Sequence, residues 1–319
     1  MKPTPAAAPL AEDVALAPAR RRWLAVWWRA VRPYSFTASV TPVLVGSAVA
    51  YQDRLFDPIR FAVTLVASLA IHAATNLVND YYDHIRGVDT AESIGPSGVI
   101  QEGLLAPRTV LRGGLILFAF GGLLGGWLVA VAGWPILAVG AASVLAGYAY
   151  TGGPLPLGYL GLGDLTVFLF MGVVIVVGAY YVQAGTVTIT ALWASLPVAA
   201  LVAGILVVNN LRDIDDDRRK GKRTLATFIG RGATRGEFFL LLALTYLSVV
   251  VGVATKMLPW STLVVLATLP RAAAVWRVVR RETDPLTLTL GGVQGTARLH
   301  QQFGLLLAVA FVLAAGSPT

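Results

Sequence analysis

The chain has 319 residues, of which 56% are apolar and 13% are charged, and its formal net charge is +8 at pH 7. Soluble domains are usually about one quarter charged, so this composition excludes an ordinary soluble domain and indicates an integral membrane protein. The chain contains no cysteine, which excludes disulfides and thiolate-bound metals.

The first 30 residues are rich in Ala and Pro and include the basic run Arg20, Arg21 and Arg22. We expect residues 1–30 to form a cytoplasmic tail that is disordered in part, without a cleavable signal peptide. The length of the remainder suits one bundle rather than two domains. Residues 31–319 are therefore predicted to form a single all-α membrane domain.

Nine apolar stretches follow one another along this domain, each close to the ~20 residues that a helix needs to cross a bilayer. They cover residues 34–51, 60–79, 111–131, 134–150, 165–184, 190–210, 236–254, 258–276 and 298–316. The sequence therefore predicts nine transmembrane helices in one bundle with a polar cavity facing the cytoplasm. The segment 282–297 is polar enough to lie on the surface or to form a short re-entrant piece.

The basic residues are distributed unevenly between the two sides of this predicted bundle. With a cytoplasmic N-terminus, all of the 25 Lys and Arg except Arg54, Arg60 and Lys256 fall in cytoplasmic segments or at span ends. This is the positive-inside bias of membrane proteins, and it accounts for the positive charge without nucleic acid as a partner. We expect a multi-pass protein of the cell membrane, the bacterial plasma (inner) membrane, with its N-terminus inside and its C-terminus outside.

An acidic cluster stands where the second apolar stretch ends, in the sequence NLVNDYYD. Asn76, Asp80 and Asp83 are spaced i, i+4, i+7, which places them on one face of a helix. Carboxylates at the end of an apolar helix are costly and usually functional. Oxygen ligands at this spacing suit Mg²⁺, which shares its coordination shell with waters and substrate phosphates.

A second cluster, NNLRDIDDD, repeats the pattern where the sixth stretch ends. Asn209, Asp213 and Asp217 share one helix face, Asp216 lies nearly on it, and Asp215 points elsewhere. Two such clusters in one chain suggest divalent metals that hold a diphosphate. The predicted metal ligands are the four carboxylates, supported by the two asparagines: Asp80, Asp83, Asp213, Asp217, Asn76 and Asn209.

Five basic residues follow the second cluster: Arg218, Arg219, Lys220, Lys222 and Arg223. Most of them fit a positive-inside anchor. Lys222 and Arg223, beyond Gly221, are equally suited to reach a diphosphate oxygen.

The loop YTGGPLPLGYLGLGD, residues 150–164, has no Lys or Arg and is rich in Gly and Pro, so it can pack closely against helices or a ligand. Four tyrosines lie near this level of the membrane: Tyr81, Tyr82, Tyr148 and Tyr150. Each fits an interfacial anchor better, although one or two facing a cavity could stabilise a carbocation. His72 is interpreted as a hydrogen-bonded structural residue, and no His has the spacing of a metal ligand.

With these residues in place, the chain resembles the UbiA superfamily of intramembrane aromatic prenyltransferases. The members have nine transmembrane helices and two Asp-rich motifs, after the second and sixth helices. The stretches that carry the resemblance to the 1,4-dihydroxy-2-naphthoate polyprenyltransferase branch are RPYSFTASVTPVLVG (32–46), NDYYDHIRGVDT (79–90), YTGGPLPLGYLGLGD (150–164), NNLRDIDDDRRKGKRTLA (209–226) and TARLHQQFG (296–304). Together they span roughly residues 30 to 310.

The resemblance implies a reaction of menaquinone biosynthesis. Prenyl diphosphate would ionise with the help of Mg²⁺, two ions in all, and the allylic cation would be attacked by 1,4-dihydroxy-2-naphthoate with loss of CO₂. Asp80, Asp83, Asp213 and Asp217 would be the catalytic metal ligands. The residues expected to bind the two substrates are Asn76, Asn209, Lys222, Arg223, Arg32, Tyr150, Asp164 and Gln183, with Arg32, Asp164 and Gln183 as candidates for orienting the aromatic acceptor.

The chain departs from the family at one place. The family commonly has a basic residue near a Gly-Pro pair after the first motif, but the segment 92–107 has no Lys or Arg. Either Lys222 or Arg223 replaces it, or the substrate differs.

Two alternatives to this function remain open on the sequence. Within the same fold the acceptor could be 4-hydroxybenzoate, homogentisate or a tetrapyrrole. A cation transporter also uses intramembrane Asp pairs, although these lie near the midplane of broken helices rather than at helix ends beside basic loops. Prenyl chain length and oligomeric state have no signature in the sequence.

Overall fold

The computed structural model describes residues 19–90 and 97–315, and every named element in them is helical. The elements are α2 (Ala19–Ala30), η1 (Pro33–Ser35), α3 (Thr37–Gln52), α4 (Pro58–Ile85), α5 (Pro107–Ala132), α6 (Pro135–Ala149), η2 (Leu157–Tyr159), α7 (Gly163–Thr166), η3 (Val167–Val174), α8 (Ile175–Ala184), α9 (Ile189–Arg219), α10 (Leu225–Ala254), η4 (Trp260–Thr268), α11 (Leu269–Arg281), α12 (Pro285–Thr287), η5 (Leu288–Val293) and α13 (Gln294–Ala314). The all-α prediction is confirmed.

Local sequence accounts for where the long helices start. Pro58, Pro107, Pro135 and Pro285 each occupy a first-turn position, where the missing N–H costs no hydrogen bond. Thr188 caps α9 by accepting a hydrogen bond from the backbone of Ala191. These helix boundaries therefore follow from local sequence.

Seven helical runs within the described residues are long and apolar enough to cross a membrane, and the chain is a multi-pass membrane protein. α6 is apolar but has 15 residues, and α3 has 16. Each of the nine apolar stretches predicted above overlaps a helix, but seven of the helical runs have the length and hydropathy of a full span. The count of nine spans therefore stays a prediction.

The prediction for residues 282–297 is confirmed in part: residues 283–287 are exposed at the surface, but the segment is not a re-entrant piece. Pro285–Ala314 is one continuous helical run in which residues 288–293 are π-helical. Leu288 is fully buried, and Thr296 satisfies its hydroxyl by donating to the Gly292 carbonyl. From Leu288 onward one face of the run is covered by neighbouring helices, because Leu288, Gly292 and Thr296 are buried there.

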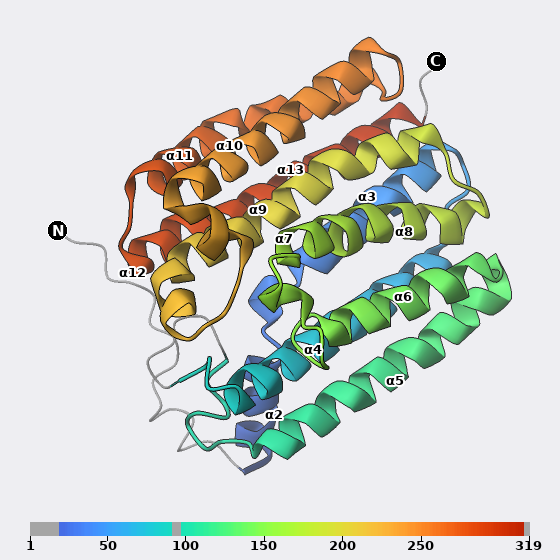
Figure 1. The fold of residues 1–319 in the computed structure, drawn as a ribbon. Coiled ribbons are helices and arrows are strands. Elements are labelled where there is room, and N and C mark those ends of the chain that lie inside the picture. The colour runs from blue at the N-terminus through green and yellow to red at the C-terminus, as the bar shows by residue number, and fades with distance from the viewer. Residues whose placement is uncertain (1–18, 91–96, 316–319) are drawn as a thin grey trace.

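The long helices run alongside one another, with α9 near the centre of the bundle (Figure 1). In the most apolar 18-residue window of α9, 72% of the residues are buried, against 17% in α5 at the edge. Small residues permit the close approach: an added Cβ on Gly172 of η3 would meet the Ala199 backbone of α9. α9 is therefore the helix around which the others are arranged.

The last turns of α4 and α9 lie at the same end of the bundle (Figure 1). Both acidic clusters are on those turns, at Asn76–Asp83 and Asn209–Asp217. The predicted tail differs in structure along its length: residues 1–18 lie outside the described residues, and Ala19–Ala30 forms α2. α2 ends in the buried Ala30, which packs in a cluster with Val99 and Val110.

Candidate active site

The first acidic motif is held by groups from three distant segments. Asp80 is 3% exposed and forms an ion pair with Arg32. Its other carboxylate oxygen accepts a hydrogen bond from Ser97 Oγ. A buried carboxylate needs such partners to offset its loss of hydration, and both oxygens of Asp80 have one.

Asn76 holds the turn that carries Arg32. Its amide nitrogen donates to the Val31 carbonyl at 3.0 Å and to Ser35 Oγ at 3.2 Å. The structure thus brings Asn76 to the first motif, where its amide N–H groups fix the chain segment opposite Asp80.

Asp83 faces the Gly/Pro-rich loop. Its Oδ1 accepts a hydrogen bond from the Tyr159 hydroxyl at 2.7 Å. The Arg86 guanidinium and the Lys222 ammonium lie 5.1 Å and 5.4 Å from the centre of the Tyr159 ring. Burial and the neighbouring Asp83 raise the pKa of Tyr159, so this phenol stays a hydrogen-bond donor.

The second motif repeats the arrangement of an ion-paired carboxylate beside an asparagine. Arg212 donates to both carboxylate oxygens of Asp213, from Nε at 2.7 Å and from Nη2 at 2.6 Å. Asn209 Nδ2 lies 3.5 Å from Asp213 Oδ2. Asn209 and Asp213 are therefore together, as the helical spacing predicted.

Asp217 has an oxygen that nothing in the described part of the chain satisfies. The residue is 4% exposed, its Oδ1 lies 3.9 Å from Lys222 Nζ, and its Oδ2 is buried without a hydrogen-bond partner. A buried, unpaired carboxylate oxygen is costly. It is the kind of atom that a bound cation satisfies.

The two motifs converge on Lys222. Burial lowers the pKa of this ammonium, but carboxylates of both motifs outweigh burial, and the net pKa is raised. The carboxylates responsible are Asp83, Asp217, Asp89 and Asp213. Asp89 lies near the same charges. Burial and the nearby Asp83 raise its pKa to about 6, while Arg32, Lys222 and Lys220 act in the opposite direction. Lys222 is therefore close to carboxylates of both acidic motifs.

Two further carboxylates of the second cluster, Asp216 and Asp215, form ion pairs. Lys220 Nζ lies 2.7 Å from Asp216 Oδ2 and donates to the Val88 carbonyl at 2.6 Å, which ties the two acidic loops together. Asp215 is exposed and pairs with Arg231 at 2.6 Å. Arg223 is exposed and makes a backbone bridge to Leu160.

Asp164 and Tyr150 lie beside the acidic motifs. Asp164 is 7% exposed and accepts a hydrogen bond from Asn210 Nδ2 at 3.1 Å. An added Cβ on Gly163 would meet the Tyr150 hydroxyl at 3.2 Å, so Tyr150 lies beside the segment that carries Asp164.

Gln183 is not brought to this site. Its side chain bonds the backbone of Asp57 in both directions, at 2.7 Å and 3.2 Å, just before α4 begins. Asp80 lies 22 positions further along α4 than Pro58, or about 33 Å. Gln183 therefore lies at the opposite end of the bundle from Asp80. The prediction that it orients the acceptor was wrong.

The donors present suit a divalent cation. No three Asp, Glu or His side chains in residues 19–90 and 97–315 form a group that could enclose a metal. Mg²⁺ typically takes one or two carboxylates and completes its shell with substrate phosphates and water. The unsatisfied Asp217 oxygen and the hard carboxylates of both motifs fit that pattern, with Asp80, Asp83, Asp213 and Asp217 as the available ligands.

Several residues of the site were not predicted from the sequence. Their side chains complete the ion pairs and hydrogen bonds described above: Ser97, Tyr159, Asp89, Arg212 and Lys220. The Gly/Pro-rich character of residues 150–164 was a signal for Tyr159, because it predicted close packing against helices or a ligand. Glu92 of the first acidic loop lies outside the described residues.

Comparisons with known proteins identify the family of the chain. The model of the UbiA prenyltransferase family matches residues 39–290. The chain is 34% identical over 298 residues to the 1,4-dihydroxy-2-naphthoate octaprenyltransferase of Bacillus subtilis, covering 93% of this chain and 95% of that protein. It is 35% identical over 268 residues to the enzyme of the same name from Mycobacterium tuberculosis, covering 84% and 85%.

Solved structures share the fold at low sequence identity. A UbiA homologue from Archaeoglobus fulgidus bound to GPP and Mg²⁺ superposes with a TM-score of 0.62 at 16% identity, covering 89% of this chain and 99% of that one. A structure of digeranylgeranylglyceryl phosphate synthase gives 0.61 at 15%, covering 92% and 98%.

The family model and the relatives define the class of this membrane protein as a prenyltransferase. The chain belongs to the UbiA prenyltransferase family, and its relatives indicate a role in the menaquinone pathway.

Proposed function

We propose that this enzyme transfers a polyprenyl group from a prenyl diphosphate to 1,4-dihydroxy-2-naphthoate, with release of diphosphate and CO₂. The observation that carries the proposal is the position of Lys222 near carboxylates of both motifs. One of these carboxylates, Asp217, has a buried oxygen without a hydrogen-bond partner. Such a site suits a diphosphate held by divalent cations. The relatives named as naphthoate octaprenyltransferases support the acceptor.

In this proposal the acidic motifs act together on the diphosphate head. Asp80 and Asp83 would hold one Mg²⁺, and Asp213 and Asp217 would hold a second. When bound, Mg²⁺ offsets the diphosphate charge and makes it a better leaving group. Without it, each carboxylate beside a phosphate charge at about 4 Å would cost on the order of 1 to 4 kcal/mol.

The chain's own cations assist the leaving group. Lys222 lies against Asp217 and the Tyr159 ring, so a small movement suffices for its ammonium to contact a diphosphate oxygen. Arg32, bound to Asp80, provides a second cation from the N-terminal side. These two residues fill the place of the basic residue that segment 92–107 lacks.

The bond changes balance without a general base. The allylic C–O bond breaks, and both electrons leave with the diphosphate. The ring carbon that bears the carboxylate attacks the allylic cation, and the carboxylate then leaves as CO₂, giving its C–C bonding pair back to the ring. No proton has to be removed, and the product is the reduced form of demethylmenaquinone. The apolar helices shield the cation from water, and Tyr150 and Asp164 line the acceptor's position.

The topology is part of the proposal. α3 and α6 cross the membrane together with the seven longer runs, which gives nine spans with the N-terminus inside, the C-terminus outside and the polar cavity on the cytoplasmic side. The positive-inside distribution of Lys and Arg supports this orientation.

Turnover of labelled prenyl diphosphate with 1,4-dihydroxy-2-naphthoate, with and without Mg²⁺, tests the function. We expect Asp217→Asn to lower the Mg²⁺-dependent rate by more than about 100-fold, because it removes a ligand at the unsatisfied oxygen. Asp215→Asn is the matched control from the same cluster. Its carboxylate is exposed and paired with Arg231, so the rate should stay within about twofold of the wild type.

Two results would contradict the mechanism: full activity in Asp217→Asn, or turnover that persists in excess chelator. Offering 4-hydroxybenzoate and homogentisate beside the naphthoate tests the acceptor separately, since prenylation of another ring would change the acceptor and leave the reaction type intact.

A further inference from the structure

Tyr159 lies between the two acidic motifs and contacts a charged side chain on each side. Its hydroxyl donates to Asp83 Oδ1 at 2.7 Å, and the Lys222 ammonium lies 5.4 Å from the centre of its ring. Asp83 belongs to the first motif, whereas Lys222 follows the second motif, with its Nζ 3.9 Å from Asp217 Oδ1. One side chain therefore joins groups from α4 and from the segment after α9.

The loop that carries Tyr159 is attached to both sides of the site. Near its start, the Arg86 guanidinium, which follows the last turn of α4, donates to the Thr151 carbonyl. At its other end, Leu160 forms a backbone bridge to Arg223, beyond the second motif. Tyr159 directly precedes that bridge, so the loop spans the distance between the two motifs with Tyr159 at the junction.

The backbone around Tyr159 is also held within the loop. The Tyr159 N–H donates to the Pro156 carbonyl at 2.9 Å, and the Gly158 N–H donates to the Tyr150 carbonyl at 2.8 Å. An added Cβ on Gly158 would meet that carbonyl oxygen at 3.1 Å, so the loop is tightly packed just before Tyr159. The contacts of the Tyr159 side chain are therefore set by the fold.

The hydroxyl and the ring of Tyr159 act on different groups. Rotation of the Asp83 carboxylate would break its bond to the hydroxyl, so this bond gives the second carboxylate oxygen a fixed direction. Hydrogen bonds of this kind to a metal ligand typically change metal affinity by about 10- to 100-fold. The ring face attracts the Lys222 ammonium, which keeps this cation beside the carboxylates of both motifs.

We propose that Tyr159 is a positioning residue for both halves of the diphosphate site: its hydroxyl orients Asp83 for a divalent cation, and its ring holds Lys222 for the diphosphate. The inference rests on the proposed function, which assigns the cation and the diphosphate to these two residues. The two effects can be separated, because Tyr159→Phe removes the hydroxyl and keeps the ring, whereas Tyr159→Leu removes both.

The test is equilibrium binding of geranyl S-thiolodiphosphate to the full-length protein in nanodiscs, measured as a function of Mn²⁺ concentration. Sulfur replaces the allylic oxygen in this analogue, so binding is measured without turnover. Tyr159→Phe should raise the Mn²⁺ concentration for half-maximal binding about tenfold. At saturating Mn²⁺ it should bind the analogue within about twofold of the wild type. Tyr159→Leu should bind about threefold or more weakly even there, because the ring is lost as well.

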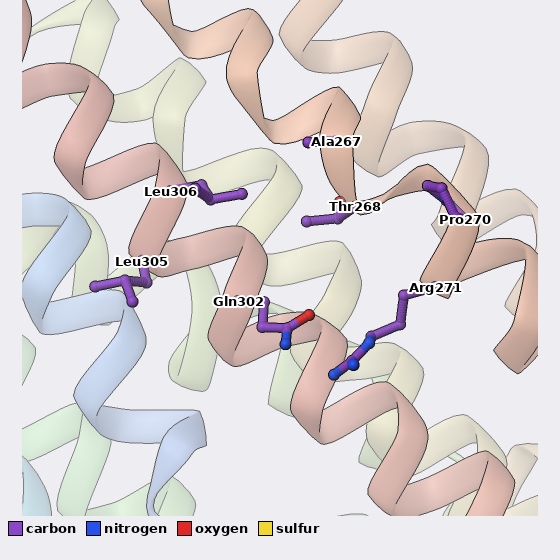
Figure 2. Close-up of a pocket in the computed structure, with 7 residues that line it drawn as sticks. All are labelled: Ala267, Thr268, Pro270, Arg271, Gln302, Leu305 and Leu306. Carbon is purple, nitrogen blue, oxygen red and sulfur yellow. The ribbon is translucent and has the colours of Figure 1, made fainter.

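Two control variants remove similar groups elsewhere. Tyr180→Phe removes another bond from a tyrosine to an aspartate, since the Tyr180 hydroxyl donates to Asp53 Oδ2 at 2.6 Å. Asp53 directly follows α3, at the end of the bundle opposite to the acidic motifs. Arg271→Gln removes a cation that lines a groove between the η4–α11 run and α13 (Figure 2), and none of the site residues lines that groove. Both variants should keep the wild-type Mn²⁺ dependence and affinity within about twofold.

A further pair of variants tests the part played by the ring. In a Lys222→Met background, Tyr159→Phe and Tyr159→Leu should bind the analogue equally at saturating Mn²⁺, because the ring then has no ammonium to hold. A ring effect that persists without Lys222 would contradict the assigned contact.

Three outcomes would overturn the inference: the wild-type Mn²⁺ dependence in Tyr159→Phe, equal binding by Tyr159→Leu and Tyr159→Phe at saturating Mn²⁺, or the same shift of Mn²⁺ dependence in Tyr180→Phe. The proposed function fails in a different way. A wild-type protein that shows no metal-dependent binding of the analogue contradicts the function and this inference with it. A wild type that binds the analogue with Mn²⁺ and prenylates the naphthoate, while Tyr159→Phe behaves identically, contradicts only the inference.

Discussion

Arg32 adopts a backbone conformation that only glycine adopts readily, with φ 55° and ψ 63°. This conformation costs about 1–3 kcal/mol and persists only where the surroundings enforce it. Here Ser35 Oγ donates to the Arg32 carbonyl at 2.8 Å, and His72 contacts Ser35 Oγ at 3.2 Å and Ser39 Oγ at 2.9 Å. The buried His72 therefore sustains the turn that presents Arg32 to Asp80.

This network predicts a specific effect of His72→Ala. Loss of the imidazole leaves two buried serine hydroxyls with fewer partners, which should lower the free energy of unfolding by about 1–3 kcal/mol. The turn would also loosen, so the prenyl diphosphate concentration for half-maximal rate should rise severalfold. Thermal unfolding in detergent and steady-state kinetics measure the two effects.

His300 offers the control for this prediction. It is also fully buried, but its ring contacts Thr37 Oγ1 at 3.5 Å rather than the serines that His72 contacts. His300→Ala should cost stability without changing half-saturation by prenyl diphosphate. Equal kinetic shifts in the two variants would show that His72 acts through packing alone.

At the scale of the helix, glycine positions decide how closely neighbours approach α9. An added Cβ at Gly172 meets the Ala199 backbone, whereas one at Gly178, about two turns later in the same run, meets nothing within 4 Å. Backbone atoms cannot rotate away, so a clash at Gly172 has to move a whole helix.

We expect Gly172→Ala to lower the free energy of unfolding by about 1–3 kcal/mol through overpacking. Gly178→Ala should be neutral or stabilise by up to about 1 kcal/mol, because Ala is the better helix former. Thermal unfolding of both variants in the same detergent measures the difference. A Gly172→Ala protein as stable as Gly178→Ala would show that η3 and α9 can separate without cost.

At the scale of the whole molecule, the absence of cysteine in the 319 residues makes topology directly measurable. Val187 is 47% exposed in the turn before α9, and the Arg219 side chain is 74% exposed at the end of α9. With the proposed orientation, Val187→Cys should react with a membrane-impermeant maleimide added to intact cells. Arg219→Cys should react only after the membrane is opened. The reverse labelling pattern would invert the topology, and labelling of both residues from outside would contradict a spanning α9.

The sequence alone determined the membrane class, the helical architecture and the two acidic motifs. Hydropathy, proline positions and the i, i+4, i+7 spacing are properties of the local sequence, and they do not depend on tertiary contacts. The same local view covered only part of residues 282–297: residues 283–287 are exposed, as their polarity predicted, whereas neighbouring helices cover Leu288, Gly292 and Thr296.

Only the tertiary structure decided which distant groups serve each carboxylate. Arg32 and Asp80 are 48 residues apart, and Tyr159 and Asp83 are 76 apart. Gln183 is polar and close to a span end, as a site residue would be, yet it lies at the opposite end of the bundle. No local spacing encodes these relations, because they arise when α4, α9 and the loop 150–164 pack against one another. The physical reason is that helical periodicity fixes the face on which a side chain lies, whereas packing fixes what that face meets.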